Sequence, residues 1–482
     1  MAVLENLEPS RVFHYFEEIA NIPHGSYHTK EISDYLAAFA VSHGLKYRQD
    51  EANNVIIWKD AAPGYENAPA VILQGHCDMV CEKVPDSNHD FTKDPLELMV
   101  EGDYITANGT TLGGDDGIAV AYALAILEDN SLRHPPLEVV ITTDEEVGLL
   151  GAAALDMSDL KGKFLINMDS EEEGYLCVGC AGGLGAACEL EVTYVAITGT
   201  KLEITIDGLV GGHSGAEIDK NRANANKLMG RFLYELGQKT EYMLASLEGG
   251  TKGNAITRTA TAVIVVEPGR EAEVQEAAAI LEKHLRKEYS GSDEGITIHC
   301  RNLGSGEADV LHPISREKVV FLLNFAPWGV QKMSGDIPGL VETSANPGIL
   351  KLDAEKFLLD VSIRSSVGSA KEAVAEKVRY LTEFLGGICT VGEGYPAWEY
   401  RKDSALREIM KETYAEMFGK EPVVNAIHAG LECGLFYEKS PELDCVSFGP
   451  DMKDIHTTEE KLSISSTERM WRYLLKVLER IK

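Results

Sequence analysis

Residues 70–80 read AVILQGHCDMV, an apolar run that ends in the polar group His76-Cys77-Asp78. Two later runs end in the same way. LEVVITT at 137–143 is followed by three acids, and FLINM at 164–168 is followed by Asp169. Short, continuously apolar runs are typical of parallel strands that are buried on both faces. Because the carboxyl ends of such strands meet at one edge of a sheet, we expect these polar side chains to gather there.

Helix-like patterns alternate with these strands. Amphipathic stretches occupy residues 8–20 and 29–44, a strand-like stretch follows at 53–59, and residues 117–128 are rich in Ala, Ile and Leu. Alternation of strands and helices is the pattern of an α/β sheet. We therefore predict an α/β fold, with a mixed, mostly parallel sheet and helices on both faces.

The pattern changes near residue 190. The stretch CELEVTYVAITGTKLEITIDGL at 188–209 contains alternating strand-like segments, and helical segments follow at about 214–238, 270–288 and 370–387. After about residue 395 the α/β character returns, ending in a helix at 465–481 in which Ser465 and Glu468 have capping-box spacing. We predict a discontinuous domain of residues 1–190 and 396–482, and an inserted α+β lid domain of residues 191–395 with two similar halves.

Composition excludes several kinds of partner. The chain has 482 residues and a net charge of −32, which argues against nucleic acid because phosphate binding needs clustered Lys and Arg. It contains neither a long apolar run nor a secretory pattern at its start, so we expect no membrane association. Nine Cys without framework spacing are expected to be reduced, as in the cytoplasm. Cys177-Val-Gly-Cys180 is a lone CxxC and predicts no structural zinc site by itself.

Each group of polar residues can be interpreted as structural or as functional. His76 and Asp78 are two residues apart on a strand, so the carboxylate could support a metal-bound imidazole, or both could be plain core residues. Asp115 and Asp116 follow two glycines and precede a helix, where acids also serve as caps. The acids at 144–146 could form a solvated turn, although three in succession repel one another without a cation.

Taken together, these groups of polar residues favour a metal site more strongly than any one of them does alone. His456, in the distant stretch DIHTTEE at 454–460, would usually be structural if it stood alone. With the strand-end residues, however, it supplies a second imidazole to several carboxylates. Such a set suits two zinc-class ions better than one and predicts a metallohydrolase. Adjacent acids can divide the labour, with Glu146 as a metal ligand and Glu145 off the metal as general base.

Seven motifs across the chain point to one family. They are GHCDMV at 75–80, TLGGDDGIAVA at 111–121, TTDEEVGLLGA at 142–152, INMDSEEEG at 166–174, GGHSGAEI at 211–218, HAGLECGLF at 428–436 and DIHTTEEKL at 454–462. With these motifs the chain resembles the di-zinc metallopeptidases that include aminoacylases and carnosinases, and among them the aminoacyl-histidine (Xaa-His) dipeptidases. The resemblance covers nearly the full length, and every expected ligand position is matched. It implies that the α/β part is a zinc-peptidase-like catalytic domain.

The resemblance also implies a role for each residue. His76 and Asp169 would hold one zinc ion, and Glu146 and His456 the other. Asp115 would bridge both ions and be followed by a cis peptide bond to Asp116. Asp78 would support His76, and Glu145 would be the general base. Cobalt or manganese could substitute for zinc, since such ligands bind all three.

The implied reaction is hydrolysis of the amide bond of dipeptides, including Xaa-His substrates such as carnosine. His213 in the GGHSG motif is the expected donor to the oxyanion, and Arg364, helped by Asn254, would bind the C-terminal carboxylate. Glu432 would meet the substrate amine, or instead tune His428. Ordinary readings stay open here: His213 could be a plain loop histidine, and Arg364 could form a surface salt bridge.

Two other functions are compatible with parts of the pattern. An amidohydrolase that deacylates N-acyl amino acids would use the same metals. A metal-binding scaffold without catalysis would lack the base, and Glu145 is present. With metals on one domain and substrate-binding residues on the other, we expect hinges near residues 190 and 395. A lid this long could complete the site in a monomer, and a homodimer formed through the lid stays open.

Overall fold

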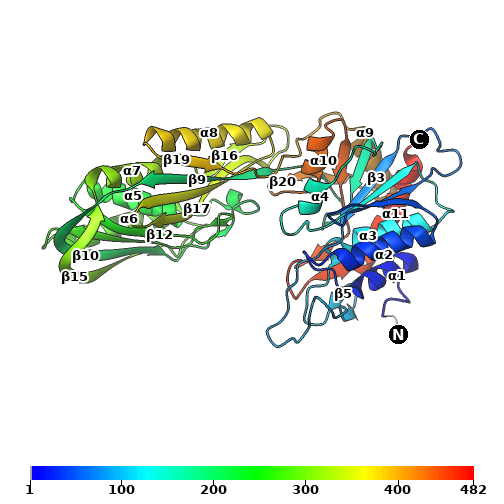
Figure 1. The fold of residues 1–482 in the computed structure, drawn as a ribbon, viewed down its shortest axis with the longest axis horizontal. Helices are drawn as coiled ribbons and strands as arrows, with labels where there is room; N and C mark the ends of the chain where they lie inside the picture. Colours follow the sequence, from blue (N-terminus) through cyan, green and yellow to red (C-terminus); the bar gives the residue numbers. More distant parts are fainter. Residues whose placement is uncertain (1–2) are drawn as a thin grey trace. The chain divides into compact units, whose positions relative to one another are not determined.

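The computed structural model describes residues 3–482, which form two compact units (Figure 1). Unit 1 comprises the described chain up to Gly179 together with Tyr400–Ala426 and Leu431–Lys482. Unit 2 comprises Cys180–Glu399 and Ile427–Gly430. The first crossing between the units precedes the expected one near residue 190, because the strand that begins at Gly182 already belongs to the sheet of unit 2.

An eight-stranded sheet forms the centre of unit 1. Its order is β1 (Lys46–Gln49), β2 (Val55–Lys59), β6 (Leu137–Thr142), β3 (Val71–His76), β7 (Phe164–Asn167), β21 (Asp444–Ser447), β8 (Tyr175–Cys180) and β20 (Val423–Ile427). The four central strands β6, β3, β7 and β21 are parallel, whereas β1, β2 and β8 pair antiparallel with their neighbours. The predicted α/β fold with a mixed sheet is therefore confirmed, and parallel pairing is confined to the middle of the sheet.

Seven helices surround this sheet: α1 (Ser10–Ala20), α2 (Lys30–Ser42), α3 (Gly114–Glu128), α4 (Leu150–Ala154), α9 (Ala405–Phe418), α10 (Cys433–Lys439) and α11 (Ile464–Arg480). Side chains alternate along β3, and they identify the two faces. Gly75 lies against Ala119 of α3, where an added Cβ would come within 2.5 Å of the alanine Cβ. Gln74 instead donates to Glu432, which immediately precedes α10. Helices thus cover both faces, as predicted (Figure 1).

Helix α3 carries the Asp115-Asp116 pair and is buried on every side. All residues from Gly114 to Leu127 are buried, and the helix packs against α1 and β3. The hydroxyl of Tyr122 donates to the carbonyl of Thr467, and its ring stacks on Trp471 of α11. This packing fixes the helix that presents Asp115.

Helix α11 begins one residue before the predicted capping box. Its cap is Ser463, whose Oγ accepts from the backbone N–H of Ser466 at 3.2 Å. Ser465 is a helical residue whose hydroxyl donates to Asp103 at 2.7 Å. The capping box expected at Ser465 is therefore wrong.

A smaller sheet in unit 1 positions the distant histidine. It consists of β22 (Met452–Lys453), β23 (Lys461–Ser463), β5 (Tyr104–Ala107) and β4 (Leu98–Glu101), all paired antiparallel. His456 lies in the connection between β22 and β23 and has a φ of 61°. Left-handed backbone is uncommon for a residue with a Cβ and concentrates at functional sites.

Unit 2 is built on a nine-stranded antiparallel sheet. Its strands are β9 (Gly182–Glu191), β10 (Tyr194–Asp207), β12 (Met243–Gly249), β14 (Ala260–Val266), β15 (Thr297–Leu311), β16 (Gly329–Met333), β17 (Val341–Leu352), β18 (Lys356–Ser365) and β19 (Ile388–Val391). A short ribbon pairs β11 (Gly212–His213) with β13 (Ala255–Ile256). Four helices accompany these strands: α5 (Ala225–Gly237), α6 (Glu271–Glu288), α7 (Pro313–Phe325) and α8 (Gly368–Phe384).

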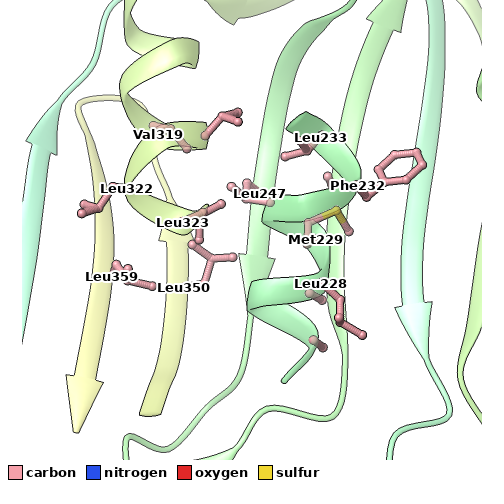
Figure 2. Close-up of a cluster of buried hydrophobic side chains, with 14 of the residues drawn as sticks. Leu228, Met229, Phe232, Leu233, Leu247, Val319, Leu322, Leu323, Leu350 and Leu359 are labelled. Carbon is pink, nitrogen blue, oxygen red and sulfur yellow. The ribbon is translucent and has the colours of Figure 1, made fainter. Parts of the chain in front are cut away.

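The core of unit 2 lies between its helices and its sheet. Figure 2 shows side chains of α5 and α7, such as Phe232 and Leu323, beside Leu247, Leu350 and Leu359 of the strands. The helix predicted from residue 214 begins only at Ala225, because the side chain of Asn224 caps it by accepting from two backbone N–H groups. Helix α7 was not predicted at all, although Pro313 stands at its start.

None of the helices in residues 3–482 combines the length and the apolar character needed to cross a membrane.

Candidate metal centre

Asp115 lies between two histidines that are far apart in the sequence, His76 and His456. His76 Nε2 is 3.3 Å from Asp115 Oδ1 and 3.7 Å from Asp169 Oδ1. His456 Nε2 is 3.1 Å from Asp115 Oδ2 and 2.8 Å from Glu146 Oε1. The five predicted metal ligands therefore lie together, in two groups that share Asp115 through its two oxygens.

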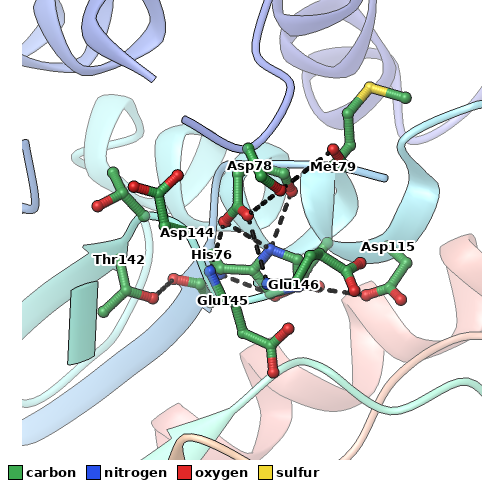
Figure 3. A network of polar contacts seen from close by, with 12 residues as sticks. His76, Asp78, Met79, Asp115, Thr142, Asp144, Glu145 and Glu146 are labelled. Carbon is green, nitrogen blue, oxygen red and sulfur yellow. Dashed lines mark hydrogen bonds and ion pairs between the residues drawn. The ribbon is translucent and has the colours of Figure 1, made fainter. Parts of the chain in front are cut away.

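The ends of the parallel strands explain this convergence. His76 is the last residue of β3, Asp169 follows β7 by two residues, and Glu145 and Glu146 follow β6. Figure 3 shows His76, Asp115, Glu145 and Glu146 gathered around one small space. Three combinations of potential ligand atoms lie within 4.8 Å of one another: Asp115 with Glu146 and His456, His76 with Asp116 and Asp169, and His76 with Glu145 and Glu146.

The imidazole of His76 is oriented mainly by the backbone. Its Nδ1 is 2.9 Å from the carbonyl oxygen of Asp78 and 3.4 Å from Asp78 Oδ1. A proton on Nδ1 that is donated to the carbonyl leaves Nε2 as a lone-pair donor toward Asp115 and Asp169. This arrangement is the ring orientation that a metal ligand requires.

The carboxylate of Asp78 also organises the loop after β6. It accepts hydrogen bonds from Ser26 Oγ at 2.8 Å, from the backbone N–H of Glu145 at 3.0 Å and from that of Glu146 at 3.4 Å (Figure 3). Asp78 thus connects His76 to the two acids. Sequence reasoning assigned it only to His76.

Glu460 is a second organising residue, and sequence reasoning missed it. This buried carboxylate accepts from four successive backbone N–H groups at the start of α3: Leu112 at 2.8 Å, Gly113 at 3.2 Å, Gly114 at 2.8 Å and Asp115 at 3.3 Å. It holds the glycine turn that delivers Asp115, and it comes from the same loop region as His456. The available signal was its place in the DIHTTEEKL motif.

Asp116 is a further buried acid to which no ligand role was assigned. The peptide bond between Asp115 and Asp116 is cis, as the resemblance implied. Asp116 Oδ2 accepts from the backbone N–H of His76 at 3.2 Å. Its Oδ1 is buried and has no hydrogen-bond partner among the described residues.

The charge of this cluster is strongly negative for its burial. Burial and the neighbouring acids raise the pKa of Asp169 and of Asp116 above the ordinary carboxyl value. Hydrogen bonds to Asp115 and Glu146 raise the pKa of His456 to about 10. These buried carboxylates repel one another, and protonation reduces the repulsion. Bound cations would neutralise the same negative charge. Imidazole and carboxylate donors in two groups fit two divalent ions of the zinc class.

Glu145, the predicted general base, has a raised pKa. Burial, followed by repulsion from Glu432, Glu146 and Asp115, raises its pKa to about 8 against an opposing effect of His76. A base works best when its pKa lies near the working pH. Glu145 lies outside the two groups that share Asp115, although it forms a third group of potential ligands with His76 and Glu146. Its role as general base stays a prediction.

A buried polar network lies on the same face of the sheet as His76. Gln74 Nε2 donates to Glu432 Oε2 at 2.5 Å, and Thr142 Oγ1 donates to the same oxygen at 2.7 Å. Asn167 donates to Gln74 at 2.6 Å. Gln74 and Asn167 each precede a predicted ligand, His76 or Asp169, by two residues. The network therefore ties together the strand ends that carry the ligands.

Glu432 occupies a different environment from the predicted one. Its side chain is 0% exposed, and burial raises its pKa to about 7. It belongs to unit 1, whereas His428 belongs to unit 2. Both donors bind its Oε2, whereas its Oε1 has no hydrogen-bond partner among the described residues. Contact with a substrate amine stays a prediction.

The remaining predicted residues gather in unit 2. An added Cβ on Gly215 would lie 2.6 Å from the carbonyl oxygen of His428, 2.9 Å from the His213 ring and 3.2 Å from Arg364 Nε. The absence of a side chain at Gly215 therefore allows the His213 ring, the Arg364 guanidinium and the backbone of His428 to approach the same loop. Asn254 lies close to this loop in space, because its backbone carbonyl accepts from the N–H of Ser214 at 2.9 Å.

Arg364 makes this second cluster positive. It is 8% exposed and donates through Nη1 to the hydroxyl of Tyr395 at 2.6 Å, while its Nε has no partner among the described residues. Burial and the nearby guanidinium lower the pKa of His213 and lower that of His428 to about 4. Both imidazoles are neutral at pH 7, beside a buried cation with a free donor.

The fold and this centre define a class. A parallel-centred α/β sheet with imidazoles and carboxylates at its carboxyl edge is the arrangement of a metal-dependent hydrolase. The family model described as Peptidase family M20/M25/M40 matches residues 72–480, and the chain belongs to this family. The prediction of a metallopeptidase of this kind is confirmed.

Individual relatives span the whole chain. It is 36% identical over 483 residues to the cytosol non-specific dipeptidase of Escherichia coli strain K12, covering 100% of this chain and 99% of that protein. The crystal structure of aminoacylhistidine dipeptidase from Vibrio alginolyticus is similar with a TM-score of 0.93 and 36% identity, covering 99% of this chain and 98% of that one. Aminopeptidase PepT from Bacillus cereus shares the fold, with a TM-score of 0.57 at 16% identity and coverage of 98% and 99%.

Proposed function

We propose that this chain is a dipeptidase that hydrolyses the amide bond of dipeptides, including Xaa-His substrates such as carnosine. The observation that carries the proposal is the position of Asp115, whose two oxygens face His76 and His456, with Glu145 close by. The full-length similarity to proteins named as dipeptidases supports it. The name of the Escherichia coli relative also supports the expected location in the cytoplasm.

Two divalent cations, zinc by preference of the donor set, would complete the centre. His76 and Asp169 would hold one and Glu146 and His456 the other, with Asp115 shared between them. When bound, such a pair lowers the pKa of water and polarises a carbonyl group. Their charge would also stabilise the ionised acids that burial now disfavours.

The residues of the chain would then divide the reaction among them. Glu145 accepts a proton from the attacking water and returns it to the leaving amine. Asp78 fixes the backbone of Glu145, so that the carboxylate stays within reach of the water. Glu460 and Asp78 act as positioning residues, because they hold Asp115 and His76 without occupying the ligand positions themselves.

Residues of unit 2 would recognise the substrate. Arg364, a buried cation with an unpaired Nε–H, is suited to a C-terminal carboxylate, with Asn254 assisting. His213 Nδ1 accepts from the backbone N–H of Ala216 at 3.0 Å, which places the ring proton on Nε2. A neutral imidazole with an Nε2 proton can donate to the oxyanion of a tetrahedral intermediate.

The test is a substrate panel combined with one matched pair of variants. We expect the zinc-loaded protein to cleave β-alanyl-histidine and other dipeptides, and to lose this activity on chelation. Glu145→Gln should lower kcat by about 10²–10⁴-fold and keep its metal content. Glu172→Gln, an exposed acid nearby, is the control and should match the wild type.

Two results would refute the proposal. Faster turnover of acetyl-amino acids than of any dipeptide would make the chain a deacylase with the same centre. Full activity in Glu145→Gln would remove the proposed base.

A further inference from the structure

Two cysteines of unit 2 face each other across neighbouring strands. Cys188 of β9 and Cys389 of β19 are direct partners in the antiparallel register. Their Sγ atoms are 3.6 Å apart, and the residues are 0% and 9% exposed. Neither takes part in the proposed reaction, and their distance is that of two thiols in contact, without a bond between them.

The geometry is close to that of a disulfide. Directly opposite residues of an antiparallel pair have Cβ atoms about 4.5–5.5 Å apart. A disulfide needs about 3.5–4.5 Å and a sulfur–sulfur bond of about 2.05 Å. Strand β19 has four residues and lies at the edge of the nine-stranded sheet, where β9 is its neighbour. An edge strand held from one side can move inward by the small distance required.

The two thiols differ in exposure and in their surroundings. The hydrogen bond with Cys188 lowers the pKa of Cys389, and the Arg379 guanidinium on α8 acts in the same direction, whereas burial and the acids Glu383 and Glu376 oppose them. The same contact and burial raise the pKa of Cys188. Since peroxide must reach the sulfur that it oxidises, Cys389, which lies on the edge strand and is the more exposed of the two, is the sulfur that reacts first.

We propose that Cys188 and Cys389 form a site of reversible oxidation, at which hydrogen peroxide converts the two thiols into a cross-strand disulfide. The Cys389 thiolate attacks one peroxide oxygen, the O–O bond breaks, and the departing hydroxide takes up a proton as water. Cys389 is then a sulfenic acid. The Cys188 sulfur attacks the Cys389 sulfur, the S–S bond forms, and a second water leaves. Two thiols are oxidised, and one peroxide is reduced to two waters.

The disulfide would enclose almost all of unit 2. Strand β9 is the first strand of this unit along the chain, and β19 is its last in the nine-stranded sheet. A bond between them closes a loop of about 200 residues, and long loops lose the most conformational freedom in the unfolded state. Oxidation should therefore raise the melting temperature of the protein. Because cross-strand geometry leaves some strain, the bond should also be readily reduced by thiols.

The experiment uses the full-length, reduced protein and dilute hydrogen peroxide, followed by alkylation and peptide mapping without reductant. We expect one linked peptide that joins Cys188 to Cys389 and is lighter than the two reduced peptides by two hydrogen atoms. It should disappear with dithiothreitol. Cys389→Ser should abolish it, whereas Cys300→Ser, which removes a half-buried thiol of the same unit, should retain it. The oxidised wild type and Cys300→Ser should melt about 5 °C higher than their reduced forms.

Clear results would overturn the proposal. Recovery of Cys389 as a sulfinic or sulfonic acid, or of both residues as alkylated thiols after peroxide has oxidised the exposed Cys81, would show that the pair does not join. A linked peptide without a rise in melting temperature would refute the stabilising effect. If Cys389→Ser does not fold, the wild-type peptide map and Cys188→Ala decide the question.

Discussion

The two clusters of predicted functional residues carry opposite charges, and each calls for a different kind of ligand. In unit 1, His76 and His456 are surrounded by carboxylates, and burial raises the pKa of several of these acids. In unit 2, burial and the nearby Arg364 guanidinium lower the pKa of His213 and of His428. On the proposed function, cations would stabilise the first cluster and an anion the second.

The same residue type therefore serves two purposes. His456 gains a proton in unit 1, because Asp115 and Glu146 accept from it when no cation is present. His428 loses its proton in unit 2, since it is buried beside Arg364. The neighbours of an imidazole decide whether it acts as a metal ligand or as a neutral hydrogen-bonding group. The predictions below test this difference in sign.

The largest effect is expected at the carboxylate that both groups of unit 1 share. Asp115→Ala removes an oxygen from each group and leaves two histidines without their common partner. We expect kcat to fall by about 10³-fold or more and the bound metal to drop well below two ions per chain. Metal analysis and dipeptide hydrolysis measure both. Retention of two tightly bound ions would contradict the bridging role.

A smaller effect is expected at the carboxylate that supports Asp115. Glu460→Gln keeps the shape of the side chain but loses the charge that accepts four backbone N–H groups. Metal affinity should fall by about 10–100-fold, as for other groups behind a ligand. The neighbouring exposed acid provides the control, and Glu459→Gln should bind zinc like the wild type. Equal affinities in a competition titration would show that the turn holds without Glu460.

The positive cluster should behave differently. Arg364→Met keeps much of the apolar stem and removes the cation, so the proposed carboxylate contact is lost. We expect KM for dipeptides to rise by about 10–100-fold, with two metal ions still bound. Arg301→Met, which removes an exposed arginine of β15 paired with Glu203, is the control. A loss of metal in Arg364→Met without a change in KM would contradict the proposed role of Arg364 in binding the substrate carboxylate.

The sequence predicted that the proposed ligands would lie together, because each stands at the end of a recognisable element. His76, Asp169 and the pair Glu145 and Glu146 end buried strands, and strand ends can be recognised from composition. Asp115 precedes a helix of Ala, Ile and Leu. Such local signals place a residue at a sheet edge without knowledge of its neighbours.

The missed features depend on distant contacts or on irregular backbone. Glu460 meets the turn at Leu112 from 348 residues away, and no local spacing announces that contact. The environment of Glu432 arises in the same way, through Gln74, 358 residues distant. The helix predicted from residue 214 starts later, because the Asn224 cap fixes its beginning at Ala225. The sequence describes elements, and packing decides which of them meet.

The smallest predicted effect concerns acid stability of unit 2. Burial and Arg364 lower the pKa of His428 from about 6.5 to about 4, with His213 acting in the same direction and Asp219 opposing it. A histidine with a lowered folded pKa contributes its full stability above pH 6.5 and loses it as the pH falls toward 4. At pH 5 the loss of folding stability should be about 2 kcal/mol.

Amide hydrogen exchange of peptides from β17 and β18 can follow this loss, and His428→Gln should remove most of the pH dependence. His299→Gln, at an exposed position of β15, should leave it unchanged. Equal acid sensitivity in His428→Gln and the wild type would show that protonation of His428 does not cause the loss of stability.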